Sequence, residues 1–161
     1  MYYLNSVYTR TQKGDTVNRK NHDKQSSICN CLNLRRASGV ITEIYDNFLK
    51  PSGLSISQFS LLAHMKKLGM VSVSDLAFKM RLDRTTLVRN LKSIEERGFI
   101  TDTALTGTRN RQLELTESGL EVLERGEVLW VEAQSFLEQS LGTDDMNTLR
   151  GLLSKIERLV P

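Results

Sequence analysis

Apolar side chains recur at helical spacing over most of the chain beyond its first 26 residues. Between Leu34 and Phe48 they return every three or four residues, as on one face of a helix, and this pattern stops before Pro51. Ser55 and Gln58 follow with the spacing of a capping box, in which each residue satisfies a backbone amide at the start of a helix. The pattern therefore predicts one helix before residue 51 and a second from about residue 55 to the glycine at position 69.

Two shorter helices are predicted next. The first carries apolar residues at positions i, i+3, i+4 and i+7 from Val73. The second begins at Asp83, a favourable N-cap residue, and ends at Gly98. Its buried stripe consists of Leu87, Leu91 and Ile94. Three short helices joined by tight turns predict a helix-turn-helix.

After Gly98 the apolar period falls from about 3.6 residues to two, which indicates strands. Residues 99–104 and 111–115 are predicted to pair, with 105–110 as the loop between them. Leu113 and Leu115 are expected to face inward. A hairpin directly behind a helix-turn-helix is a wing.

Two helices are predicted after the wing, one from a Thr116 cap to about Gly142 and one from Thr143. The longer helix has two apolar stripes, which indicates burial on two sides. The last helix has one stripe, and so does the first helix of the chain. These helices have more apolar surface than one small domain can cover, so the sequence predicts a homodimer. The stripe of the last helix contains Leu149, Leu152, Leu153, Ile156, Leu159 and Val160.

Charge is distributed unevenly along the 161 residues, although the net charge is only +3. Residues 1–26 and 27–71 each carry five basic and two acidic side chains, and residues 72–114 carry eight and six. Residues 115–161 carry four basic and nine acidic side chains. A basic front joined to an acidic rear suits a polyanionic partner at one end, although ordinary solvated faces would explain this distribution equally well.

Several ordered motifs resemble the MarR family of winged helix-turn-helix transcriptional regulators. Ser74–Ala77 opens the motif, Asp83–Arg89 resembles the start of the recognition helix, and Leu91–Ile100 resembles its exit into the wing. Leu115–Gly119 is similar to the junction between wing and helix, and the likeness covers roughly residues 30–160. It implies a homodimeric repressor that covers a pseudo-palindromic site on double-stranded DNA. The family is usually released from DNA by an effector, either a small phenolic or lipophilic acid or an oxidant.

The predicted fold is thus mainly α, with a small wing of two or three β-strands and a winged helix-turn-helix flanked by dimerisation helices. Residues 1–26 are interpreted as a mobile basic tail, because they lack apolar periodicity. Residues 27–161 are expected to form a single MarR-like domain. Its dimerisation helices fall within 27–54 and 117–161, and its winged helix-turn-helix within 55–116.

DNA contacts are expected from the face of the recognition helix opposite Leu87 and Leu91. At about 100° per residue, that face presents hydrogen-bonding groups short enough to reach base edges. Arg89 suits guanine or a phosphate, whereas Arg84 and Lys92 suit phosphates. The face comprises Thr85, Arg89, Lys92 and Ser93, with Thr86 nearby.

The wing is expected to add a second contact. Arg109 matches the family's wing-tip arginine, which suits the narrow, electronegative minor groove. The family commonly has an aspartate two residues earlier that holds this arginine, but this chain has Gly107. Asn110 and Arg111 are therefore candidates to share the contact.

No catalytic residues, metal ligands or cofactor are predicted. Of the two histidines, His22 lies in the tail and His64 in a mostly apolar helix, and no phosphate loop or nucleophile elbow is present. No apolar run is long enough to cross a bilayer, so a cytoplasmic protein is expected. The alternative function is a winged helix that binds only proteins, which the cationic surface of the motif disfavours.

Cys29 and Cys31 leave three interpretations open. A cysteine near a helix N-terminus can react with oxidants, and some members of the family sense peroxides through one near the start of their first helix. A Cys-x-Cys pair without further ligands is a weak metal signal, and inert thiols are the remaining reading. Residues two apart on a helix point about 200° away from each other, which disfavours a bridge within a regular helix.

Overall fold

The computed structural model describes residues 27–104 and 111–159 and divides into two compact units, Met1–Arg36 and Ala37–Pro161. Helix α2 begins in the first unit, where the Asn33 side chain bonds both to the backbone N–H and to the carbonyl of Ser27. The elements in chain order are α2 (Asn30–Leu49), the 3-10 helix η1 (Lys50–Ser52), α3 (Ile56–Leu68), β1 (Val71–Ser72), α4 (Val73–Met80), α5 (Arg84–Glu96), β2 (Ile100–Asp102), β3 (Gln112–Leu115), α6 (Glu117–Leu141) and α7 (Thr143–Glu157).

Three predicted helix caps are confirmed, and each depends on bonds within one turn. Ser55 and Gln58 form a complete capping box on α3. Asp83 caps α5, and Thr116 caps α6. Gly69 follows the last residue of α3, as expected.

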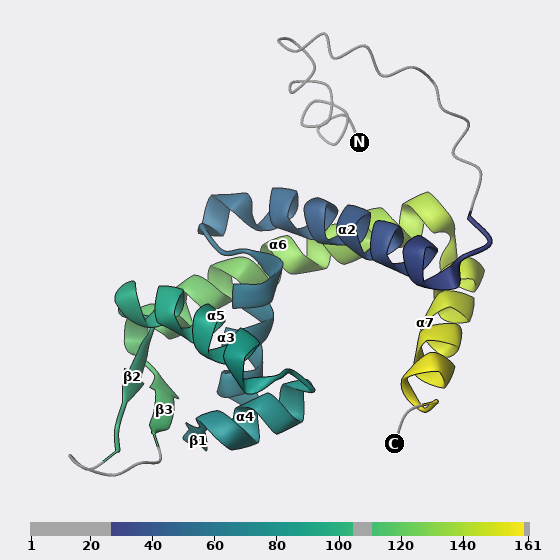
Figure 1. Ribbon diagram of the computed structural model, residues 1–161. Helices are drawn as coiled ribbons and strands as arrows, with labels where there is room; N and C mark the ends of the chain where they lie inside the picture. The colour runs from purple at the N-terminus through teal and green to yellow at the C-terminus, as the bar shows by residue number, and fades with distance from the viewer. Residues whose placement is uncertain (1–26, 105–110, 160–161) are drawn as a thin grey trace, which may run out of the picture. The chain divides into compact units, whose positions relative to one another are not determined.

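A three-stranded antiparallel sheet with the order β1-β3-β2 forms the wing (Figure 1). Ile100 pairs with Leu115, and Asp102 pairs with Leu113. Strand β1 joins the other edge of β3 through Val71, which pairs with Leu113. Both hairpin strands are shorter than predicted, and of the two leucines expected to face inward, Leu113 is fully buried and Leu115 partly so.

The core of the unit 37–161 lies among α3, α4, α5, α6 and the sheet. Its largest fully buried side chains come from every one of these elements. The arrangement is a winged helix-turn-helix carried on a long helix, so the predicted fold class is confirmed. The largest fully buried side chains of this core are Leu49, Leu61, Leu62, Met65, Leu76, Leu87, Leu91, Ile94, Leu113, Leu123 and Val122.

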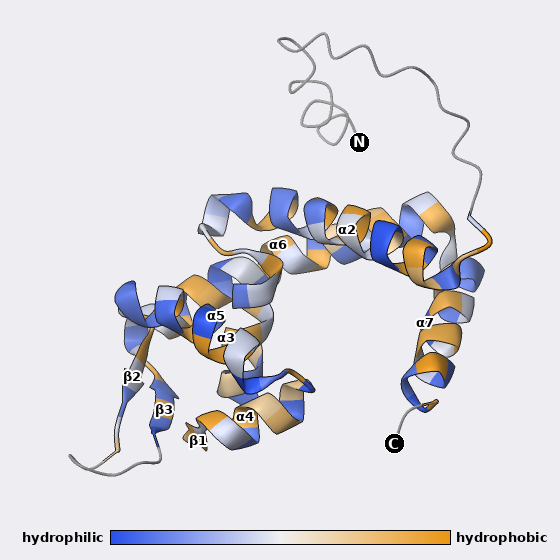
Figure 2. Ribbon diagram, in the orientation of Figure 1, coloured by the Kyte–Doolittle hydropathy of each residue, from blue (hydrophilic) through white to orange (hydrophobic). Residues whose placement is uncertain are grey.

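Helix α7 has apolar side chains that the single chain leaves exposed. Figure 2 shows apolar residues alternating with polar ones along this helix. Met146 is buried, but the apolar side chains that follow it on α7 are exposed. An exposed apolar face of this kind is typical of a protein–protein interface. The exposed side chains are Leu149, Leu152, Leu153, Ile156 and Leu159.

Within residues 27–104 and 111–159, no helix combines the length and the apolar character that a membrane crossing requires.

Candidate nucleic-acid interface

Helix α5 begins at a fixed turn. Arg81 ends α4 in the left-handed region, with φ of 51°, and this tight reversal directs the chain into Asp83. The Asp83 carboxylate accepts the Thr86 backbone N–H at 2.9 Å and the Thr86 hydroxyl at 2.5 Å. The hydroxyl contact is the main cause that holds the pKa of Asp83 below its usual range. The first turn of α5 is therefore well anchored.

The two faces of α5 differ sharply in burial. Leu87, Leu91 and Ile94 are at most 1% exposed and fix the helix to the core. Thr85 and Arg89 lie on the exposed side. No hydrogen bond or ion pair engages either side chain within residues 27–104 and 111–159, so both are available to a ligand.

Two more of the expected cations, Arg84 and Lys92, lie on α5, and each contacts one neighbouring side chain. Arg84 donates from its guanidinium to the Ser74 hydroxyl on α4, at 2.8 Å, which directs the side chain across the helix-turn-helix. Lys92 lies 3.8 Å from Glu96 in an i,i+4 ion pair and keeps 77% of its side chain exposed. Exposed pairs of this kind are weak, so Lys92 can exchange Glu96 for a phosphate.

Ser93 was expected on the outward face, and this prediction is wrong. Its hydroxyl accepts a hydrogen bond from Gln58 Nε2 at 3.1 Å, and the residue is half-buried. Helical periodicity alone puts Ser93 on the outward face of α5, but α3 packs against that flank and covers the residue. Thr86 is also half-buried, and its hydroxyl already donates to Asp83.

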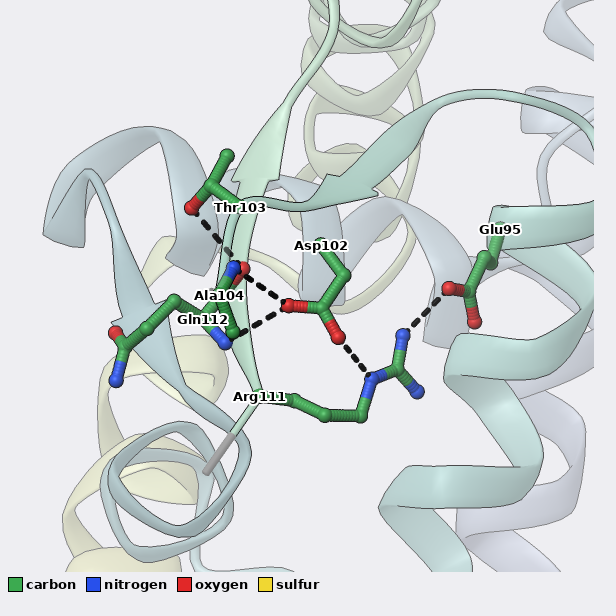
Figure 3. A network of polar contacts seen from close by, with 6 residues as sticks. All are labelled: Glu95, Asp102, Thr103, Ala104, Arg111 and Gln112. Carbon is green, nitrogen blue, oxygen red and sulfur yellow. Dashed lines mark hydrogen bonds and ion pairs between the residues drawn. The ribbon is translucent and has the colours of Figure 1, made fainter. Parts of the chain in front are cut away.

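The wing residues fall into two groups. Arg109 and Asn110 lie outside the described residues. Arg111 lies just before β3, and its guanidinium donates to Asp102 on β2 and to Glu95 on α5, at 2.7 and 2.5 Å (Figure 3). Contacts within the chain thus occupy the one expected wing cation that the structure describes.

Four residues of this surface were not identified from the sequence, namely Gln58, Ser74, Glu95 and Asp102. Each orients another polar side chain across two elements. The hairpin register is the one signal that could have revealed a member of the group, because it brings Asp102 close to the start of β3. The pattern of the sequence alone did not fix that register.

The remaining candidates lie on the surface. Cys29 and Cys31 are both exposed free thiols beside the start of α2. His64 is exposed on α3, and its Nδ1 lies 2.7 Å from the Ser60 carbonyl oxygen. Among the described residues, no group of three or more His, Cys, Asp or Glu could hold a metal ion.

Comparisons with known proteins agree with this geometry. The model of the MarR family matches residues 54–107, which run from the start of the helix-turn-helix into the wing. A transcriptional regulator of M. tuberculosis, MosR, solved in complex with DNA, is 33% identical with a TM-score of 0.65. The alignment covers 81% of this chain and 99% of MosR. The chain belongs to the MarR family of transcriptional regulators.

Two further relatives extend the comparison. The transcriptional repressor CouR, solved with p-coumaroyl-CoA, is 25% identical with a TM-score of 0.74, over 81% of this chain and 93% of CouR. A Thauera aromatica protein, named for transcriptional regulation of the hcr operon, is 33% identical over 89 residues. That match includes 55% of this chain and spans about half, 54%, of the Thauera protein.

Proposed function

We propose that this protein is a sequence-specific DNA-binding repressor that works as a homodimer. One observation carries the proposal: α5 is fixed to the core by three buried apolar side chains, while Thr85 and Arg89 face outward without partners among the described residues. A rigid helix with free hydrogen-bonding groups on its outer face can enter the major groove and read base edges. The related MosR has been solved with DNA.

The proposed contacts divide by chemistry. Arg89 and Thr85 read bases, whereas Arg84 and Lys92 hold phosphates and set the register. Thr86 lies at the edge of this surface, and its hydroxyl oxygen can still accept a hydrogen bond. Arg109 and Asn110, outside the described residues, remain proposed contacts of the wing.

Release from DNA is proposed to follow an effector, as CouR, a repressor solved with an acyl-CoA thioester, suggests. The effector would be a small organic acid, its thioester or an oxidant. It would change the spacing of two recognition helices, which must lie about 34 Å apart to enter successive major grooves. We propose that the protein acts on DNA in the cytoplasm and catalyses no reaction.

Selection of bound duplexes from random-sequence DNA tests the proposal and gives the operator. With that duplex, Arg89→Ala should weaken binding by about 1–3 kcal/mol and relax the preference at one position per half-site. Lys92→Ala is the matched control, because losing a phosphate contact should weaken operator and random DNA alike. If wild-type protein shows neither selection nor salt-dependent binding, the chain is a protein-interaction module instead.

A further inference from the structure

Arg111 joins the hairpin to the recognition helix through two carboxylates of different elements. Its Nε donates to Asp102 Oδ2 at 2.7 Å, and a terminal guanidinium nitrogen donates to Glu95 Oε1 at 2.5 Å. Figure 3 shows the guanidinium between the two acids, with Asp102 on the hairpin and Glu95 on α5. The planar fork of arginine suits this double contact, which the single ammonium of lysine cannot reproduce.

Asp102 also holds both strands of the hairpin. Its Oδ1 accepts the backbone N–H of Ala104 at 3.0 Å and that of Gln112 at 3.1 Å. The hydrogen bond from Arg111, followed by that from the Ala104 amide, holds the pKa of Asp102 below its usual range. The carboxylate is therefore ionised at neutral pH and organises the backbone on both sides of the hairpin loop.

These bonds conflict with a role for Arg111 as a DNA ligand. Two of its N–H groups point to these carboxylates, and a move toward a phosphate that broke those bonds would leave both carboxylate charges unpaired near a polyanion. Charge-assisted hydrogen bonds of this kind are among the stronger ones in proteins. The side chains of Glu95, Asp102 and Arg111 are 39%, 29% and 38% exposed, so these ion pairs lie at the surface, where solvent screens them in part.

We propose that Glu95, Asp102 and Arg111 form a brace that fixes the β2–β3 hairpin against the recognition helix and thereby sets operator specificity. Arg111 is then a positioning residue and not a DNA contact. This inference rests on the proposed function, because it concerns how the same surface is held for DNA. The brace links the two parts of the winged motif that must enter DNA in a fixed relation to each other.

Removing one carboxylate distinguishes simple repulsion of DNA from a role in the brace, because the two predict opposite changes in DNA affinity. Both Asp102 and Glu95 are negative charges within the segment proposed to bind DNA. If they do nothing but repel phosphates, their removal should tighten binding to any DNA. If they form the brace, their removal should weaken binding to the operator, although a repulsive charge has been lost.

Asp102→Asn is the first test, with Glu114→Gln as its matched control on the same hairpin. Glu114 is exposed on β3, and its side chain forms no hydrogen bond or ion pair within the described residues. We expect Asp102→Asn to bind the selected operator roughly 2- to 30-fold more weakly and random DNA equally or more tightly. Glu114→Gln should weaken neither. Equal or tighter operator binding by Asp102→Asn would overturn the brace.

Glu95→Ala is the second test and leaves every bond within the hairpin intact. It should also weaken operator binding selectively, whereas Glu96→Ala, which frees Lys92 from its exposed ion pair, should leave operator binding equal or tighter. If Asp102→Asn unfolds, which its circular dichroism would reveal, the Glu95 and Glu96 pair decides the matter. No loss of operator affinity in Glu95→Ala would then overturn the proposal.

The salt dependence of binding tests Arg111 itself. A phosphate ligand contributes about 0.9 to the slope of log affinity against log salt concentration. Arg111→Gln should lower operator affinity with that slope unchanged, and a slope reduced by about one would make Arg111 a phosphate contact. Wild-type protein that binds no DNA would refute the proposed function, whereas wild-type binding with tighter Asp102→Asn and Glu95→Ala variants would refute the brace alone.

Discussion

Gln58 and Ser93, 35 positions apart in the sequence, are joined by a hydrogen bond of 3.1 Å from the amide Nε2 to the serine Oγ. The same Gln58 accepts the Ser55 backbone N–H through Oε1, at 3.0 Å. One side chain therefore completes the N-terminal cap of α3 and holds the recognition helix α5. The orientation of α5 depends on this bond as well as on its buried leucines.

Ser93→Ala should lower the free energy of unfolding by about 1 kcal/mol, because it removes this hydrogen bond at a half-buried position. Gln58→Ala removes the donor to Ser93 together with the acceptor for the Ser55 amide. In that background the effect of Ser93→Ala should largely disappear, since the two residues act as a pair. Urea unfolding of the four proteins measures this coupling, and additive effects would contradict it.

The Gln58–Ser93 bond also shows where sequence reasoning ends. The caps formed by Ser55, Asp83 and Thr116 were predictable, because each joins atoms three residues apart in one turn. The partner of Ser93 depends on how α3 crosses α5, and no local pattern encodes that crossing. Helical spacing gave the buried side of α5 correctly and misjudged its flank.

The wing shows the same limit. Alternating residues predicted the hairpin, but β1 has only two residues, too few for a period to appear. The contact from Arg111 to Glu95 joins residues 16 positions apart, one just before β3 and the other on α5. The sequence identified Arg111 as a cation of the wing, whereas its partners required the packed structure.

Gly119 should tolerate no side chain. A Cβ built at this position in α6 would lie 2.0 Å from the Phe99 carbonyl oxygen, a backbone atom that cannot simply turn aside. Gly119→Ala should therefore cost about 1–3 kcal/mol of stability, as overpacked sites do. Thermal unfolding followed by circular dichroism measures the loss.

Gly39 supplies the control for that substitution. It also lies in a helix, α2, but a Cβ there would meet no heavy atom within 4 Å. Gly39→Ala should stabilise the helix by about 0.5–1 kcal/mol, because alanine restricts the unfolded backbone more than glycine does. If both variants shifted stability in the same direction, close packing at Gly119 would not be the cause.

The exposed apolar face of α7 should mediate dimer formation. Leu152 and Ile156 are 52% and 44% exposed in the single chain, so replacing both by Glu should leave the packing of one subunit almost unchanged. Burying the new charges between subunits would be costly, and the protein should become monomeric. Light scattering during size-exclusion chromatography measures the mass.

Phe78→Glu serves as the control for the α7 variant. Phe78 is 79% exposed on α4, outside the helices proposed for dimerisation, so its substitution should leave the mass unchanged. The α7 variant should also bind operator DNA more weakly, because one subunit brings one recognition helix. A folded dimer after the double substitution in α7 would exclude this face as the interface.

Mild peroxide should abolish operator binding, and a reductant should restore it, if the exposed thiols of Cys29 and Cys31 respond to oxidants. Cys29 precedes α2, and its carbonyl accepts the Asn33 N–H at 3.1 Å, whereas Cys31 belongs to the first turn. A bridge between the two would require that turn to unwind, so a disulfide formed without unwinding must join two subunits. Non-reducing electrophoresis distinguishes a doubled mass from modified monomers.

Single Cys→Ser variants identify the thiol that reacts first, because the response should vanish with one of them. The double Cys29→Ser, Cys31→Ser protein is the decisive control. If it still leaves the operator on peroxide treatment, both thiols are bystanders, and the oxidant acts elsewhere in the chain. If instead neither the wild-type nor the variant protein responds to peroxide, we expect a small organic effector to release the DNA. Measuring operator binding in the presence of candidate acids and thioesters would identify that effector.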